Sequence, residues 1–158
     1  MSKEISLVKQ REKRKRKNYK CYTIQQQQDF LSLLYFNEYC EDKKNILYEI
    51  EKDIIYKIRN YKIQDIKKKR YVGDITYDNI LEKLIESKLM CYYCKRKVAI
   101  CYRFKNQQNQ WTLDRIDNDS SHTHNNCVIS CLHCNITKRN RSHNQFKFSK
   151  QVKIIKEE

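Results

Sequence analysis

The stretch at residues 111–135, WTLDRIDNDSSHTHNNCVISCLHCN, decides how this chain folds. It begins with a short apolar segment at 111–113 and contains a second one at 127–130. Two short apolar runs separated by turn-forming residues are typical of a β-hairpin, and Asp-Asn-Asp-Ser-Ser supplies the turn chemistry here. The second run leads directly into a cysteine pair. We therefore predict a hairpin that ends in a cysteine knuckle.

Two cysteine pairs with two-residue spacers frame this stretch, Cys91/Cys94 upstream of it and Cys131/Cys134 at its end. Each spacer lets both sulfurs of a pair face one ion, and four thiolates complete a tetrahedral structural zinc site. We therefore predict that these cysteines bind structural Zn²⁺. The alternative is four unrelated thiols, but paired spacings of this kind rarely arise by chance.

The chain shows no secretory signal sequence and no apolar run long enough to span a bilayer. We expect an intracellular protein, in the cytoplasm, the nucleus or a viral particle of a host cell, and neither a secreted nor a membrane protein. Reducing conditions there favour metal binding by the cysteine pairs over disulfide formation.

Basic residues outnumber acidic ones by 34 to 19 in the 158-residue chain, for a formal net charge of +15. Such a charge predicts affinity for a polyanion, and DNA is the natural partner. Residues 1–20 hold nine basic and two acidic residues and little that can be buried. We predict a disordered arm there that contacts phosphates through Arg11, Lys13, Arg14, Lys15, Arg16 and Lys17. The alternatives are a nuclear-localisation cluster and a merely solvated tail.

Residues 21–73 have the pattern of a helical subdomain. Apolar residues recur at steps of three and four, which predicts helices over 25–39 and 45–61, the second with Asn45 as its N-cap. Ten basic residues nearly balance eight acidic ones, which favours a structural or docking role over a catalytic one. Gly73, the only glycine, predicts a turn at the boundary.

Residues 74–158 are predicted to form a second part that contains the hairpin. A helix is expected over 77–90, with Thr76 as its N-cap, and it leads into Cys91. Alternating apolar residues predict a strand over 95–104, and a short helix is expected to continue after Asn135. The apolar residues of 146–155 are expected to pack back on this part. The predicted fold class is α+β with a helical N-terminal half.

The motifs of this second part resemble a known family. L-D-R-I-D-N, then H, then N-C-V-I-S-C-x-x-C-N-x-x-K-R is similar to the zinc-stapled HNH endonucleases, the ββα-metal or His-Me finger nucleases, which include phage homing enzymes. The order C-Y-Y-C-K, T-L-D-R-I-D-N, C-L-x-C-N also resembles HNH endonucleases of large DNA viruses. The resemblance covers residues 74–150 and implies metal-dependent hydrolysis of DNA phosphodiester bonds by an HNH endonuclease domain at 74–158.

The resemblance implies roles for three residues. Asp114 and Asn135 match the family's ligands to the catalytic divalent ion, Mg²⁺ or Mn²⁺. Asn126 matches the asparagine that braces the loop. Two oxygen ligands leave such an ion room for waters and phosphate oxygens.

One position departs from the family pattern. The residue after the metal aspartate is usually a histidine that acts as general base, but here it is Arg115, which stays protonated. We predict that His122 takes this role, with His124 as the alternative, and that Arg115 holds a phosphate. Basic residues after Asn135, including Lys138 and Arg139, are expected to meet backbone phosphate.

Two other classes of function compete with a nuclease. The same zinc core could belong to a catalytically silent DNA-binding or packaging protein, in which Arg115 marks the loss of the base. The N-terminal helices could instead make the chain a protein-interaction module. Each candidate residue also has an ordinary interpretation, since His122 and His124 could be solvated loop residues. The sequence sets no oligomeric state.

Overall fold

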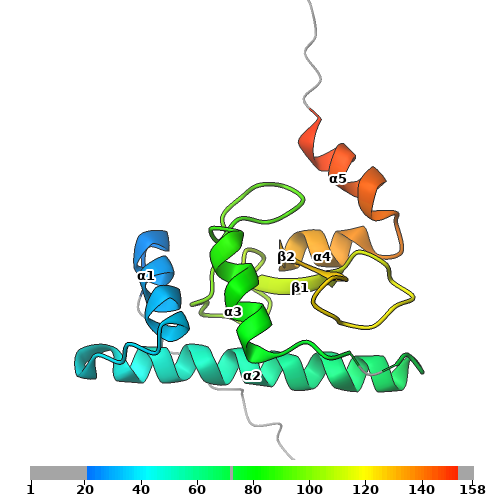
Figure 1. The fold of residues 1–158 in the computed structure, drawn as a ribbon. Coiled ribbons are helices and arrows are strands. Elements are labelled where there is room, and N and C mark those ends of the chain that lie inside the picture. The colour runs from blue at the N-terminus through cyan, green and yellow to red at the C-terminus, as the bar shows by residue number, and fades with distance from the viewer. Residues whose placement is uncertain (1–20, 72, 153–158) are drawn as a thin grey trace, which may run out of the picture.

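The computed structural model describes residues 21–71 and 73–152, so the predicted basic arm at 1–20 lies outside the described residues. The fold is mixed α+β, as predicted, with helices and one small two-stranded sheet (Figure 1). In chain order the elements are α1 (Ile24–Tyr35), the 3-10 turn η1 (Glu41–Lys43), α2 (Lys44–Lys67), α3 (Tyr77–Glu86), β1 (Trp111–Arg115), β2 (Cys127–Cys131), α4 (Leu132–Lys138) and α5 (His143–Gln151).

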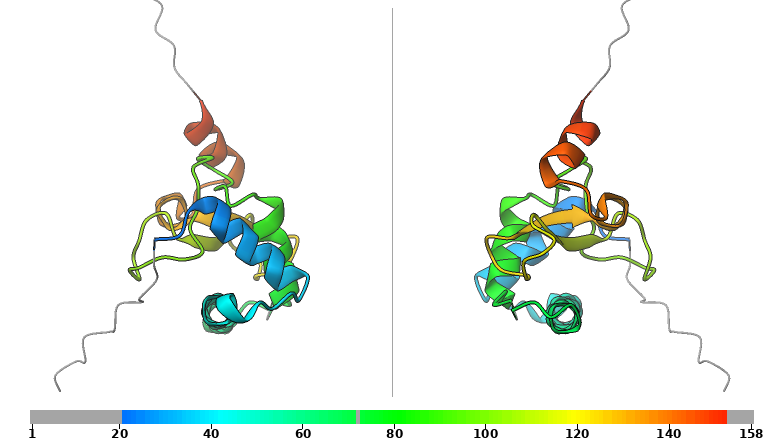
Figure 2. Two further views of the ribbon diagram at one scale, coloured as in Figure 1. Left: turned by 90° about the vertical axis from the view of Figure 1, so that its left-hand side faces the viewer. Right: turned by 90° about the vertical axis from the view of Figure 1, so that its right-hand side faces the viewer.

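The long helix α2 is the base of the fold, and the other described elements lie on one side of it (Figures 1 and 2). Its buried face begins with the apolar residues Leu47 and Ile50. From Asp53 onward the same face also carries buried polar side chains at helical spacing, which include Asp53, Lys57 and Asp65. This change of chemistry along one face brings charged groups of α2 against the hairpin.

Helices α1 and α3 begin with capping boxes. Thr23 accepts a hydrogen bond from the Gln26 backbone, and Thr76, as predicted, does the same for Asn79. The helix expected to reach residue 90 ends at Glu86, because Lys88 and Leu89 adopt left-handed φ angles of 50° and 52°. This reversal turns the chain toward Cys91.

The hairpin forms as predicted. Strands β1 and β2 pair antiparallel with Trp111 opposite Cys131, Leu113 opposite Ile129 and Arg115 opposite Cys127. Helix α4 follows β2 without a connecting loop, so its first turn lies beside the hairpin. This register fixes where Asp114 and Asn135 stand relative to each other.

Two sequence predictions about individual segments are wrong. Residues 95–104 form no strand; only isolated bridges occur there, Met90 with Lys97 and Ala99 with Gln110. All residues from 98 to 102 are buried, so the segment has no solvent face for a strand pattern to expose. Asn45 is no N-cap, because η1 runs directly into α2, which begins at Lys44.

Gly73 has a different task from the predicted turn. Its φ is not positive, and a Cβ built on it would lie 1.9 Å from the carbonyl oxygen of His122. Glycine is therefore required because two backbones approach closely.

Residues on both sides of the boundary expected at residue 73 share one hydrophobic core, in which Phe30, Ile54 and Trp111 are members. The closing segment packs back through Phe146, which is buried, whereas Phe148 is exposed. None of the described helices has the length and apolar character needed to cross a bilayer.

Candidate metal centre and adjoining groove

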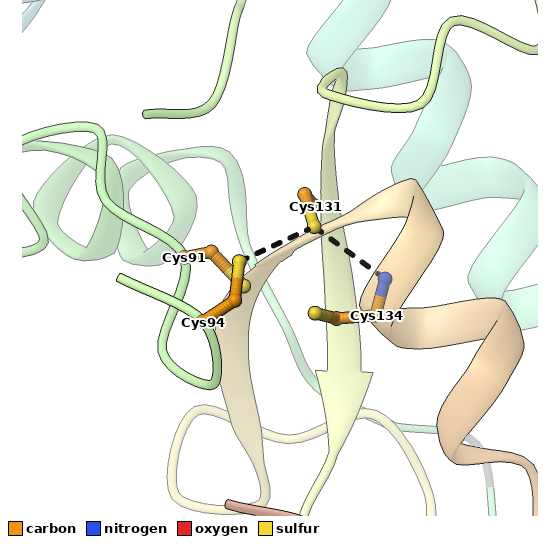
Figure 3. A group of neighbouring side chains, drawn as sticks. All are labelled: Cys91, Cys94, Cys131 and Cys134. Atoms are coloured by element: carbon orange, nitrogen blue, oxygen red, sulfur yellow. Dashed lines mark hydrogen bonds between the residues drawn. The ribbon is translucent and has the colours of Figure 1, made fainter. Parts of the chain in front are cut away.

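The four cysteines of the two knuckles form one cluster (Figure 3). Their sulfur atoms all lie within 4.8 Å of one another, and those of Cys94 and Cys131 are 3.9 Å apart. Thiolates at the usual Zn–S distance around one tetrahedral ion are separated by about 3.8 Å. The cluster could therefore hold a structural metal ion such as zinc.

Local backbone geometry builds both knuckles. The Lys95 amide donates to the Cys91 carbonyl at 3.0 Å, which closes the first knuckle with Lys95 at φ 57°. Cys131 ends β2 and caps α4, accepting from the Cys134 amide at 3.4 Å. A hydrogen bond of 2.8 Å from the Tyr92 amide to the Ile129 carbonyl ties the first knuckle to β2.

The thiols of this cluster differ in how readily they lose protons when no ion is bound. Burial raises the pKa of Cys134 to about 12. A hydrogen bond from the Cys131 thiol lowers the pKa of Cys91. Without a cation the four thiolate charges would oppose one another, and an ion would replace the protons. Cys101 and Cys127 are buried outside the cluster.

A groove of about 880 Å³ lies beside the hairpin. It runs between the C-terminal end of α2, the end of β1, the loop after β1, and α4. Its lining includes Asp114, His122 and Asn135. Five basic side chains also line it, Lys68, Arg70, Arg115, Arg139 and Arg141. Three aspartates line it as well, Asp114, Asp117 and Asp119, so basic side chains outnumber acidic ones by five to three. Thus five of the residues predicted from the sequence, Asp114, Arg115, His122, Asn135 and Arg139, meet in one concave surface with an excess of positive charge.

Asp114 is already paired within the protein. Its Oδ2 accepts a hydrogen bond of 2.5 Å from the Tyr93 hydroxyl and lies 3.1 Å from the Lys138 ammonium. Burial and Asp114 raise the pKa of Tyr93, so this hydroxyl stays protonated and donates. Its Oδ1 makes no hydrogen bond to the part of the chain that the structure describes. One carboxylate oxygen is thus left for a ligand in the groove.

Asn135 joins α4 to β1. Its amide nitrogen donates to Thr112 Oγ1 and to the Leu113 carbonyl, both at 3.1 Å. Its Oδ1 has no hydrogen-bond partner among residues 21–71 and 73–152. Asp114 and Asn135 each therefore keep one oxygen free of such bonds while lining the same groove.

Lys138 lies elsewhere than the sequence predicts. It is fully buried, and its ammonium contacts Asp114, the Arg115 carbonyl at 2.6 Å and Asn118 Oδ1 at 3.3 Å. It therefore holds the site together from inside and does not face a phosphate. Arg139, by contrast, is exposed on the groove wall.

His122 is buried against α2. Its Nδ1 lies 3.0 Å from both carboxylate oxygens of Asp65, and its backbone amide donates to Asp65 Oδ2 at 3.0 Å. The ring stacks on Tyr61 with 4.7 Å between centroids. Burial, together with the charges of Arg115 and Arg70, lowers the pKa of His122 below its ordinary value of 6.5 although Asp65 raises it, so the imidazole is mostly neutral at pH 7. His124 does not line the groove.

Asn126 and Arg115 hold the loop between the strands. The Asn126 side chain accepts from the Asp117 amide at 2.9 Å and donates to the carbonyls of Asp117 and Ser121 at 3.0 and 2.9 Å. These contacts brace the loop between the two strands. Arg115 donates to the Ser120 carbonyl at 3.2 Å and lies 3.7 Å from Asp65, so part of its guanidinium is turned away from the groove.

Sequence reasoning missed Asp65 and the pairing of Asp114 with Tyr93 and Lys138. The signal for Asp65 was present, because it continues the buried face of α2 at helical spacing from Ile54 and Tyr61. An acidic residue on an otherwise apolar face indicates a buried partner.

No family model, no curated protein and no solved structure matches this chain. Its function is therefore inferred from the chemistry of the site.

Proposed function

We propose that this chain is a metal-dependent endonuclease of the HNH, or ββα-metal, type that hydrolyses phosphodiester bonds in DNA. The observation that carries the proposal is the meeting of Asp114 and Asn135 in one cationic groove next to the four-cysteine cluster. Carboxylate and amide oxygens are the ligands that Mg²⁺ and Mn²⁺ prefer. Each of these residues has one oxygen without a hydrogen bond to a described residue.

The residues around these oxygens have complementary tasks. Asp114 and Asn135 would hold the divalent ion, which when bound stabilises the charge that develops on the phosphate. Arg139 and the other arginines of the groove bind the phosphates of the strand. Neutral His122 accepts a proton from the attacking water. Asn126 and Lys138 keep the loop and the end of β1 in place.

A second candidate is a catalytically silent DNA-binding protein derived from such a nuclease. The ion pair between Asp114 and Lys138 favours it, because a carboxylate already neutralised by an ammonium attracts a divalent ion less strongly. Arg115 also favours this candidate, because the family has a histidine at that position. Both candidates bind DNA, and only one cuts it.

Incubation of the zinc-loaded chain with supercoiled plasmid and Mg²⁺ or Mn²⁺ at low salt separates the two. For the nuclease we expect nicked or linear product, lost by about 100-fold or more in Asp114→Asn and Asn135→Ala. Asp74→Asn and Asn125→Ala are the matched controls, since both residues are exposed and outside the groove lining.

Equal zinc content and circular dichroism in all variants would show that the losses are chemical. Plasmid binding without cleavage under either ion would reject the nuclease and leave the silent DNA-binding protein. Cleavage that survives in Asp114→Asn would place the catalytic site elsewhere.

A further inference from the structure

We infer that Asp65 of α2 is the positioning residue for His122, holding the imidazole proton on Nδ1 so that Nε2 is the atom that takes a proton in the groove. This inference rests on the proposed nuclease function and names a residue that neither the motifs nor the resemblance contains. Asp65 is 57 residues away from His122 in the chain.

Asp65 and Tyr61 hold the imidazole of His122, and Gly73 lies against its backbone. The carboxylate is fully buried and lies 3.0 Å from Nδ1 through either oxygen, while it also accepts from the His122 backbone amide. Tyr61, one turn earlier on α2, stacks on the ring. Gly73 lies against the His122 carbonyl. Both the backbone and the ring of His122 are therefore held in place, and His122 is one of the residues that line the groove.

A buried carboxylate beside Nδ1 selects one tautomer. An ionised carboxylate only accepts hydrogen bonds, so Nδ1 carries the hydrogen and the lone pair stays on Nε2. No described residue makes a hydrogen bond to Nε2. This atom is left for water in the groove.

The step balances as general-base hydrolysis. Nε2 takes a proton from water as the water oxygen forms a bond to phosphorus, and the bond from phosphorus to the leaving oxygen breaks. The products are a phosphomonoester and an alcohol. The imidazolium formed is stabilised by the Asp65 charge and then gives its proton to the leaving oxygen or to solvent.

Cationic groups surround this pair. Burial lowers the pKa of His122, and the charges of Arg115 and Arg70 lower it further. Arg115 lies 3.7 Å from Asp65 Oδ1. Asp65 raises this pKa. Tyr61 is the other titratable neighbour on α2. Loss of the Asp65 charge should therefore lower the pKa of His122 further and release its tautomer.

The helical N-terminal half is then part of the catalytic site. The family supplies its base next to the metal aspartate, and here Arg115 fills that place and turns toward Asp65. Helix α2 provides the carboxylate that orients a base located in the loop. This assigns α2 a function beyond the structural or docking role that its balanced charge suggested.

The experiment compares Asp65→Asn with Asp53→Asn in the full zinc-loaded chain. Asp53 is the matched control, because it is a buried carboxylate on the same face of α2 and binds the Tyr102 hydroxyl instead. Nitrogen-15 NMR of the histidine rings reports the tautomer and pKa of His122, and plasmid nicking is followed over the pH range. Asparagine keeps the shape and can still accept from the His122 amide.

We expect the Nδ1–H tautomer in the wild type and in Asp53→Asn. In Asp65→Asn we expect a mixture of tautomers and a lower pKa. Nicking by Asp65→Asn should fall by about 10- to 100-fold at pH 7, and the acidic limb of its pH–rate profile should move to lower pH. A purely structural Asp65 would leave the tautomer and the position of that limb unchanged, which overturns the inference.

Failure of the inference and of the nuclease proposal remain distinguishable. A wild type that nicks DNA with His122 in the Nε2–H form overturns the role of Asp65 and of Nε2 as the base, and leaves the nuclease proposal standing. A wild type that holds the Nδ1–H form and never nicks overturns the nuclease, and with it the role of His122 as a base.

Discussion

The four-cysteine cluster and the groove beside it differ in their accessibility and in the kinds of side chain that form them. The cluster is made of one ligand type, with Cys91 and Cys134 fully buried and Cys94 partly buried, and its sulfur atoms all lie within 4.8 Å of one another. The groove is open and mixes Asp114, His122 and Asn135 with five basic side chains. A closed thiolate set suits a permanent ion, whereas an open polar surface suits a ligand that arrives and leaves.

The two regions also differ in how they are assembled. The cluster needs only two short spacers and the hairpin between them. The groove is lined by side chains from α2, β1, the loop and α4. Its residues are held by contacts between distant parts of the chain, such as that of His122 with Asp65, 57 residues apart. Damage to the cluster should therefore unfold the site, while damage to the groove should change it locally.

Replacement of a cluster cysteine is the strongest test of this difference. Cys131→Ser should abolish stoichiometric zinc binding and the cooperative unfolding transition, because structural Zn²⁺ contributes on the order of 10 kcal/mol or more to such folds. Elemental analysis and thermal denaturation measure both. Cys40→Ser, at an exposed cysteine outside the cluster, should change neither. A Cys131→Ser chain that unfolds like the wild type would refute a structural metal site.

The buried ion pair of the groove should give the next largest effect. Lys138→Met removes the ammonium from Asp114 and leaves its carboxylate buried and unpaired, at a cost of about 3–5 kcal/mol. Urea denaturation of the zinc-loaded chain measures it. Adding Asp114→Asn should recover part of the loss, because no charge is then left without a partner. Lys105→Met, at an exposed lysine, should stay within about 0.5 kcal/mol of the wild type.

The close approach at Gly73 should matter less. Gly73→Ala puts a methyl group against the His122 carbonyl, and the backbones must separate at a cost of about 1–3 kcal/mol. The neighbouring Asp74→Ala, at an exposed residue, is the control for urea denaturation. An alanine variant as stable as the wild type would contradict the requirement for glycine at this position.

Titration of His143 should give the smallest effect. Burial, then the charges of Lys138 and Lys147, lower its pKa below the ordinary value of 6.5. The unfolded chain therefore binds protons more readily, so the stability is fully present above about pH 6.5 and falls as the pH drops toward the folded pKa. His143→Gln should make the dependence of the free energy of unfolding on pH shallower, and Asn144→Gln should not. An equal slope in both variants would contradict the lowered pKa.

The sequence predicts those parts of the molecule that depend on near neighbours. The cysteine spacings, the Thr76 cap and the hairpin are local patterns, and the structure confirms the hairpin, the cap and a four-cysteine cluster. The pairing of Asp65 with His122 and the burial of Lys138 follow from how α2 and α4 lie against the hairpin. No local pattern contains that arrangement. The predicted strand at 95–104 shows the converse, since residues 98–102 are all buried despite the alternating pattern.

The position of Trp111 in the hairpin makes its fluorescence sensitive to the four-cysteine cluster. It is the only tryptophan, it is buried opposite Cys131, and the Lys57 ammonium lies 4.2 Å from its ring centroid. Its indole emission therefore originates from a single site, one strand away from a sulfur of the four-cysteine cluster. Removal of the ion should shift this emission to longer wavelength as water reaches the ring, so the chain reports the state of its own cluster without a label.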